Sequence, residues 1–187
     1  MAQPAEPGPP ATVMRGAAMG DDARALEELF RTYYAAVVGV ASRVLGDRAR
    51  AEDVAQEVFL GLVERRTGQP PPGRGWLYAA AAHRALNVLR GERRRGSREE
   101  GLFRRDGAPG LAEDPAVVTA RRRQRAVVRA ALLRLPERQA AILVLRHSGL
   151  RYAEVGQALG ISPASVGTLL RRAEQAMRKE LGDDASE

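Results

Sequence analysis

The chain contains no cysteine, two histidines, few aromatic residues and no long apolar run. Without cysteine it forms neither disulfides nor thiolate-bound zinc, which fits a reducing compartment. His83 and His147 are too few for a histidine-rich metal site. The apolar run "AAILVL" is far shorter than the about 20 residues of a membrane-spanning helix, and the N-terminus has no apolar signal core. We therefore expect a soluble cytoplasmic protein without membrane insertion, metal or cofactor.

The composition favours a helical protein with an anionic partner. Hydrophobic residues make up 44% of the chain but aromatics only 4%, so the core consists mainly of Leu, Val and Ala, which suit helices better than sheets. A net charge of +7 favours nucleic acid or an acidic membrane surface as a partner. The length of 187 residues suits one ordinary domain or two small ones.

The chain divides into two helical blocks. Residues 1–20 are rich in Pro, Gly and Ala and are predicted to be a disordered tail. A first domain spans residues 21–96, a linker of mixed charge residues 97–117, and a second domain residues 118–182, with a short tail at 183–187. Because no alternating strand pattern appears, the predicted fold class is all-α.

Turn signals divide each block into helices. Gly46 ends the first helix and Asp47 caps a second over residues 48–64. The stretch "RTGQPPPGRG" at residues 66–75 is predicted to be a loop, followed by a helix from Trp76 to about residue 95. In the second block the predicted breaks fall at residues 135–136, 148–149 and 160–162.

The stretch "AEDVAQEVFL", residues 51–60, gathers acid in a basic chain. Asp53 and Glu57 lie four residues apart and share a helix face, whereas Val54 and Val58 face inward. Such a patch suits a basic protein partner. One alternative is a merely solvated helix face. Another is a carboxylate-based catalytic site, which is disfavoured because no nucleophile or histidine lies nearby in the sequence. The candidate docking residues are Glu52, Asp53, Gln56 and Glu57.

A polar stripe on the predicted third helix combines an aromatic ring, an imidazole, an amide and guanidinium groups. These groups stack on bases, bond to base edges and neutralise phosphates. Ordinary roles compete: a core anchor for Trp76, a half-buried structural role for His83 and a solvated helix end for the arginines. The candidate nucleic-acid contacts on this stripe are Trp76, His83, Asn87, Arg90 and Arg94.

Residues 152–181 form a helix-turn-helix pattern. Gly160 supplies the turn, Ser162 caps the second helix and Pro163 takes its first position. Small polar residues at the start of that helix can approach bases, with arginines behind them. An ordinary helical hairpin with a basic face is the alternative. The candidate DNA contacts are Ser165, Thr168, Arg171 and Arg172.

Together, "AEDVAQEVFL", "WLYAAAAHRALNVLRGERRR" and the segment from "LLRLPERQ" to "RKEL" resemble an extracytoplasmic-function (ECF) sigma factor of bacterial RNA polymerase. The resemblance covers residues 22 to 182 in the order of sigma domain two, a flexible linker and sigma domain four. It implies a non-enzymatic transcription initiation factor that binds core polymerase and recognises promoter DNA. By family habit it also implies an anti-sigma factor, which no residue here indicates.

The resemblance assigns a role to each candidate face. The acidic helix would dock on the β′ coiled coil and domain four on the β flap. The helix from Trp76, together with Arg74 of the preceding loop, would read and open the −10 element, and the helix-turn-helix would read the −35 element. The linker would span both, since twenty-one extended residues reach roughly 70 Å.

The chain departs from the family pattern at both DNA faces. Family members usually carry Arg-Asn where this chain has Ala82-His83, and Asp where it has Asn87. They usually carry Lys-Ser-Arg where this chain has Gly167-Thr168-Leu169, so two cations are missing. The promoter sequence is therefore not transferable. A stand-alone helix-turn-helix regulator is the main rival, but it leaves the first block unexplained.

Overall fold

The structure, a computed structural model, describes residues 11–64, 72–96 and 115–183. These residues form helices and short turns and contain no strand, which confirms the predicted all-α class. The helices are α1 (Ala11–Leu45), α2 (Arg48–Val63), α3 (Arg74–Gly96), α4 (Pro115–Arg134), α5 (Glu137–His147), α6 (Tyr152–Leu159) and α7 (Pro163–Asp183).

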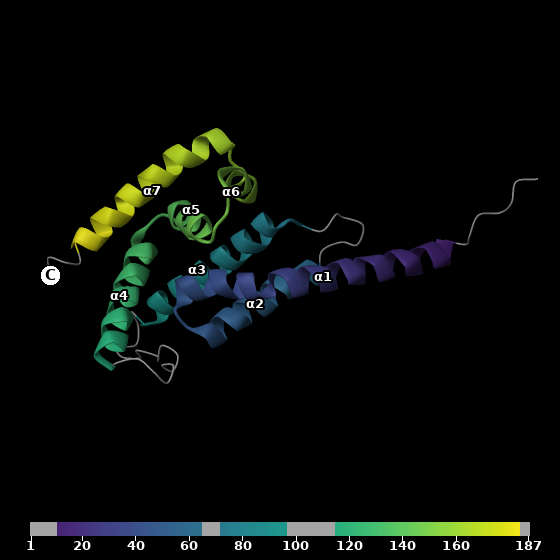
Figure 1. Ribbon diagram of the computed structural model, residues 1–187, viewed down its shortest axis with the longest axis horizontal. Coiled ribbons are helices and arrows are strands. Elements are labelled where there is room, and N and C mark those ends of the chain that lie inside the picture. The colour runs from purple at the N-terminus through teal and green to yellow at the C-terminus, as the bar shows by residue number, and fades with distance from the viewer. Residues whose placement is uncertain (1–10, 65–71, 97–114, 184–187) are drawn as a thin grey trace, which may run out of the picture.

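Helices α1, α2 and α3 pack along one another as the first half of the molecule (Figure 1). Gly46 ends α1 at a positive φ of 71°, and the carboxylate of Asp47 accepts a hydrogen bond of 2.9 Å from the N–H of Arg50. Val54 and Val58 of α2 are buried, as predicted. The buried faces also include Leu62 of α2 and Leu77, Ala81, Ala85, Leu86 and Leu89 of α3.

Helices α4 to α7 form the second half, and α6 and α7 make the predicted helix-turn-helix. Gly160 turns the chain at a φ of 63°, which L-residues with side chains rarely adopt. Ser162 Oγ then accepts a hydrogen bond of 3.2 Å from the N–H of Ser165, so the predicted cap is confirmed. Val166, Leu170 and Ala173 bury one face of α7, which leaves its other face to solvent.

Three predicted boundaries differ from the structure. Helix α1 begins at Ala11, so residues 11–20 are helical and not a disordered tail. Ala and Met favour helix strongly enough to extend α1 despite two glycines. Residues 74–75, predicted as loop, form the first turn of α3, and residues 115–117, predicted as linker, begin α4 at a proline. Residues 72–73 of the predicted loop lie outside any helix, as predicted, and residues 66–71 and 97–114 of the two predicted connections lie outside the described residues.

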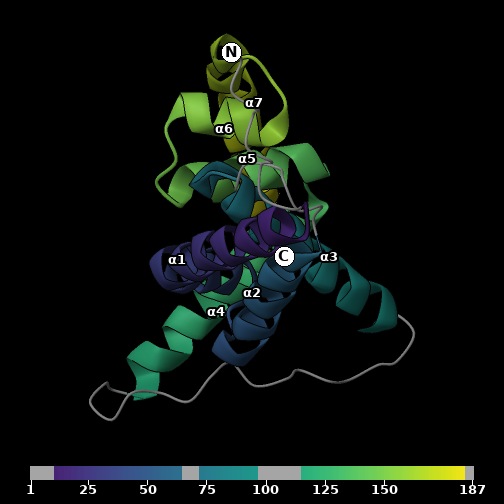
Figure 2. The same ribbon diagram turned by 90° about the vertical axis from the view of Figure 1, so that its right-hand side faces the viewer.

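The two halves lie against each other (Figures 1 and 2). Helix α3 of the first half contacts both α5 and α6 of the second. The buried residues form one cluster that runs from Val37 of α1 through Leu86 of α3 to Leu145 of α5. The faces of α3 that do not meet α1 and α2 are therefore partly covered by the second half.

Candidate protein and nucleic-acid interfaces

The acidic face of α2 is mostly exposed, but its carboxylates differ in their partners. Glu52 pairs with Arg48 at 2.8 Å, and Glu57 pairs with Arg84 of α3 at 2.9 Å. Asp53 is exposed and forms no ion pair within the described part of the chain. Gln56 is exposed beside it. Asp53 is therefore the carboxylate on this face that is available to a basic partner without first losing an internal one.

A shallow apolar groove of about 500 Å³ adjoins this acidic face. Its lining includes Phe30, Phe59, Leu60 and Val63, together with Gln56. Phe30, Leu60 and Val63 are large apolar side chains that remain 45%, 61% and 59% exposed, respectively. Sequence reasoning missed the groove, although Leu60 and Val63 lie outside the inward stripe of α2. Acidic and apolar groups together make a better protein-binding surface than carboxylates alone.

The candidate residues predicted on one stripe of α3 are not all exposed to solvent in the structure. Trp76 packs against the core, whereas Asn87 and Arg94 are exposed. His83 and Arg90 instead contact the second half of the molecule, as does Arg74 in the first turn. The structure thus divides the candidate residues into an anchor, two exposed groups and three groups engaged by α5 and α6.

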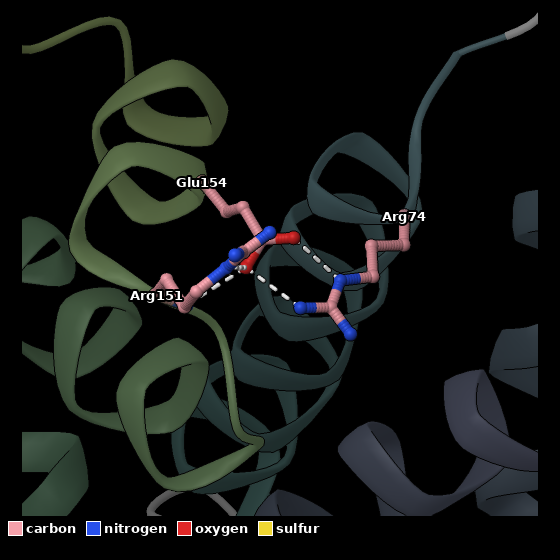
Figure 3. A network of polar contacts seen from close by, with 3 residues as sticks. All are labelled: Arg74, Arg151 and Glu154. Atoms are coloured by element: carbon pink, nitrogen blue, oxygen red, sulfur yellow. Dashed lines mark hydrogen bonds and ion pairs between the residues drawn. The ribbon is translucent and has the colours of Figure 1, made fainter.

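Arg74 makes a two-pronged ion pair with Glu154 of α6 (Figure 3). Its Nε and one terminal nitrogen donate to the two carboxylate oxygens at 2.5 and 2.7 Å. The Glu154 side chain is only 19% exposed and also accepts from the backbone N–H of Arg151 at 2.8 Å, which caps α6. The Arg74 side-chain hydrogen bond, followed by the Arg151 backbone one, lowers the pKa of Glu154 to about 2.

Glu137, at the start of α5, holds the other two engaged residues. One of its carboxylate oxygens lies 2.9 Å from His83 Nδ1 and the other lies 3.2 Å from a guanidinium nitrogen of Arg90. Arg90 also donates to the carbonyl oxygen of Leu135 at 3.4 Å. Two carboxylates of the second half therefore meet three groups that sequence reasoning assigned to DNA.

A basic cleft of about 660 Å³ lies at another part of the contact between the halves. Arg43 and Arg48 line it from the first half, and α4 contributes three arginines spaced one turn apart. Those three are Arg121, Arg125 and Arg129. No Asp or Glu is among the described residues that line it, so the lining of this cleft is basic.

The outer face of α7 carries the remaining candidates. Thr168, Arg171 and Arg172 are exposed, and neither arginine pairs with an acid in the described part of the chain. Ser165 is exposed too, but its hydroxyl lies 2.7 Å from that of Ser162 within the cap of α7. This face remains open, in contrast to the one on α3.

Family models match both halves of the chain. The model described as Sigma-70 region 2 matches residues 29–95, and that described as Sigma-70 region 4 matches residues 125–177. The ECF RNA polymerase sigma factor SigE of Mycolicibacterium smegmatis is 32% identical over 175 residues, which cover 91% of this chain and 67% of that protein. The chain belongs to the ECF family of RNA polymerase sigma factors.

A second relative resembles the chain in sequence, and a solved structure resembles it in fold. The sigma factor CarQ of Myxococcus xanthus is 29% identical over 165 residues, covering 85% of this chain and 90% of CarQ. The fold resembles that of the sigma factor RpoE of Bartonella quintana, solved in complex with the anti-sigma factor NepR, with a TM-score of 0.51 and 16% identity. That likeness covers 83% of this sigma factor and 96% of the other chain.

Family membership accounts for both halves of the molecule. It makes this sigma factor a transcription initiation factor, whereas a stand-alone helix-turn-helix regulator leaves α1 to α3 without a role. No group of acidic and histidine side chains suited to a metal ion occurs in residues 11–64, 72–96 and 115–183. Within the same ranges, no helix combines the length and apolar character that crossing a membrane requires.

Proposed function

We propose that this sigma factor docks on core RNA polymerase through the acidic face of α2 and the apolar groove beside it. The carrying observation is that Asp53 is exposed and has no ion-pair partner in the described part of the chain, and that Leu60 and Val63 are exposed further along the same helix. A basic, partly apolar surface such as the β′ coiled coil complements this combination. Glu52, Gln56 and Glu57 then contribute at the edges of the contact, because both glutamates already pair with arginines.

Promoter DNA is bound by two separate faces in this proposal. The face of α3 reads the −10 element through Arg74, Trp76, His83, Asn87, Arg90 and Arg94. The face of α7 reads the −35 element through Ser165, Thr168, Arg171 and Arg172. The supporting feature is that each face carries guanidinium groups opposite a buried apolar side, as a helix presented to phosphates and bases requires.

The proposal also covers domain limits, partners and location. Residues 21–96 act as sigma domain two and residues 118–182 as sigma domain four, with domain four on the β flap and an anti-sigma factor as a further partner. The protein acts in the cytoplasm and catalyses no reaction itself. Melting of the −10 region draws on base capture and phosphate contacts and consumes no nucleotide.

Charge reversal at Asp53 tests the docking surface. Asp53→Arg replaces attraction by repulsion at an exposed position, so the affinity for core polymerase should fall at least about tenfold while helicity is unchanged. Glu57→Arg is a poorer test because it also places two arginines together at Arg84. Glu28→Arg, an exposed reversal on α1, is the matched control. Unchanged core affinity of Asp53→Arg would exclude this docking surface.

A further inference from the structure

The basic cleft between α1, α2 and α4 has no part in the proposed function. Its volume of about 660 Å³ lies within the range of about 300–1,000 Å³ that is usual for small-molecule sites. The end of α1, the start of α2 and the middle of α4 meet around it (Figure 1). None of the residues proposed to contact polymerase or DNA is among its described lining residues. The cleft is therefore a candidate site for a further ligand.

The described lining of the cleft is rich in positive charge and in hydrogen-bond donors. Its five guanidinium groups belong to Arg43, Arg48, Arg121, Arg125 and Arg129. Ser42 and Gln124 add a hydroxyl and an amide. Asp47 lies between two lining residues in the sequence, but its carboxylate caps α2 and is not part of the described lining. The lining therefore favours an anionic ligand.

Two of these arginines are available to a ligand without losing an internal partner. Arg43 and Arg125 are exposed and form no ion pair with the acids that the structure describes. The other three have interactions within the chain, such as the pair of Arg48 with Glu52 at 2.8 Å. The site therefore depends first on Arg43 and Arg125, and the remaining arginines add to the positive potential around them.

Guanidinium groups on two different helices favour a ligand with more than one phosphate. A guanidinium matches a phosphate through two parallel N–H donors. Arg43 lies on α1 and Arg125 on α4, so a ligand that pairs with both must span the cleft. A chain of phosphates carries negative charge along its whole length and can meet both sides. A monocarboxylate offers only one charge to five guanidinium groups.

We propose that this cleft binds a small polyphosphate, either an inorganic chain or the phosphate chain of a nucleotide, between Arg43 of α1 and Arg125 of α4. Ser42 and Gln124 donate hydrogen bonds to the phosphate oxygens. Because the ligand contacts a helix of each half, it binds only while α1 and α4 line the same cleft. The site is separate from the docking and DNA faces, so it does not depend on the proposed function.

Calorimetric titration of the full chain, without divalent cations, tests the ligand class. The probes are inorganic tripolyphosphate, ATP and inorganic phosphate. Tripolyphosphate should bind at least about tenfold more tightly than inorganic phosphate, because it pairs with both helices. Tighter binding of ATP than of tripolyphosphate would indicate a nucleotide, whereas equal or weaker binding of ATP would indicate that the phosphate chain alone is recognised. Equal affinities for tripolyphosphate and inorganic phosphate would contradict the proposal.

A pair of double variants tests the place of binding. Arg43→Gln combined with Arg125→Gln should weaken tripolyphosphate binding at least about tenfold, because both guanidinium contacts are lost. Arg24→Gln combined with Arg123→Gln removes the same charge from exposed positions of the same helices, outside the described lining. This control should bind within about twofold of the unsubstituted chain, since salt screens distant exposed charges. Equal weakening in both double variants would show a response to net charge alone and would exclude the site.

Arginine modification locates the ligand in the unsubstituted chain. Phenylglyoxal reacts with accessible guanidinium groups, and mass spectrometry measures the reaction at each arginine. Saturating tripolyphosphate should slow the reaction of Arg43 and Arg125 several-fold and leave Arg24 and Arg123 unchanged. Failure to protect Arg43 and Arg125 overturns the proposal. If single-stranded DNA of random sequence protects them and tripolyphosphate does not, the cleft binds a nucleic-acid backbone and the proposal is wrong.

Discussion

The two faces proposed to bind DNA differ in availability, although both were predicted from polar and basic residues on a helix with an apolar opposite side. On α3, three of the candidate residues are held by carboxylates of the other half, whereas on α7 both candidate arginines face solvent without an acidic partner in the described part of the chain. Charge and periodicity identify both faces equally well. Availability depends on what packs over each face, and that differs between the middle of the molecule and its edge.

Position in the fold explains the difference. Helix α3 lies between α1 and α2 on one side and α5 and α6 on the other, so its outward residues still meet neighbours (Figure 2). Helix α7 buries the stripe of Val166, Leu170 and Ala173 against its own half and leaves the opposite face uncovered. Helix α7, at the edge, keeps one free face, whereas among the candidate residues of the central helix α3 only Asn87 and Arg94 are exposed.

The largest expected effect is at the open face. Arg171→Ala or Arg172→Ala should cost about 1–3 kcal/mol of binding to duplex promoter DNA and relax preference at one position if the residue reads a base. A phosphate-only contact should weaken all sequences alike and lower the salt slope by about one unit. Affinity across sequences and salt concentrations separates the two. Unchanged affinity and slope in both variants would show that α7 is not the reading helix.

At the covered face, Glu154→Gln should break the contact selectively. Gln still accepts the N–H of Arg151 and so preserves the cap of α6, whereas the charge-assisted bonds to Arg74 are weakened. The packing of the halves should lose about 1–3 kcal/mol. Small-angle scattering should then show a larger radius of gyration. Arg151→Gln, which keeps the backbone cap and leaves Arg74 with Glu154, is the control and should stay compact.

The same pair predicts how the contact responds to acid. The pKa of Glu154 is about 2 in the folded chain against 4.5 for the free side chain. Because the folded value is depressed, the stabilisation is complete above about pH 4.5 and is lost as pH falls towards 2. A distance probe across α3 and α6 should therefore be constant from neutral pH to about 4.5. A loss of contact in that upper range would assign the acid sensitivity to a group other than Glu154.

The smallest expected effect concerns the basic cleft. Arg125→Gln removes one of five facing arginines, so it should favour packing of the halves by less than about 1 kcal/mol. The effect should shrink as salt rises, since these groups are largely exposed. Thermal unfolding at low and high salt measures it. Arg123→Gln on the same helix, outside the cleft lining, is the matched control and should show no such salt-dependent gain.

Sequence reasoning anticipated most local structure, for reasons that lie within a few residues. Gly46 and Gly160 adopt positive φ, and Asp47 and Ser162 cap the following helices as predicted. These features depend on neighbours in the chain and not on the rest of the fold. It was less successful at Ala11 and Pro115, where helices begin earlier than expected. Both segments lack a regular spacing of apolar residues, so they were not predicted as helix, although several of their residues favour helix.

The sequence by itself determined the helices, their buried and polar faces, and the resemblance to ECF sigma factors that the comparisons confirm. Only the tertiary structure decided which polar residues meet. The residues around Arg74 and His83 do not indicate that Glu154 and Glu137 are their partners. Helix periodicity relates residues three or four positions apart, whereas these partners lie at least 54 positions away. Contacts of that range follow from how two packed halves are oriented, and that orientation separates the covered face of α3 from the open face of α7.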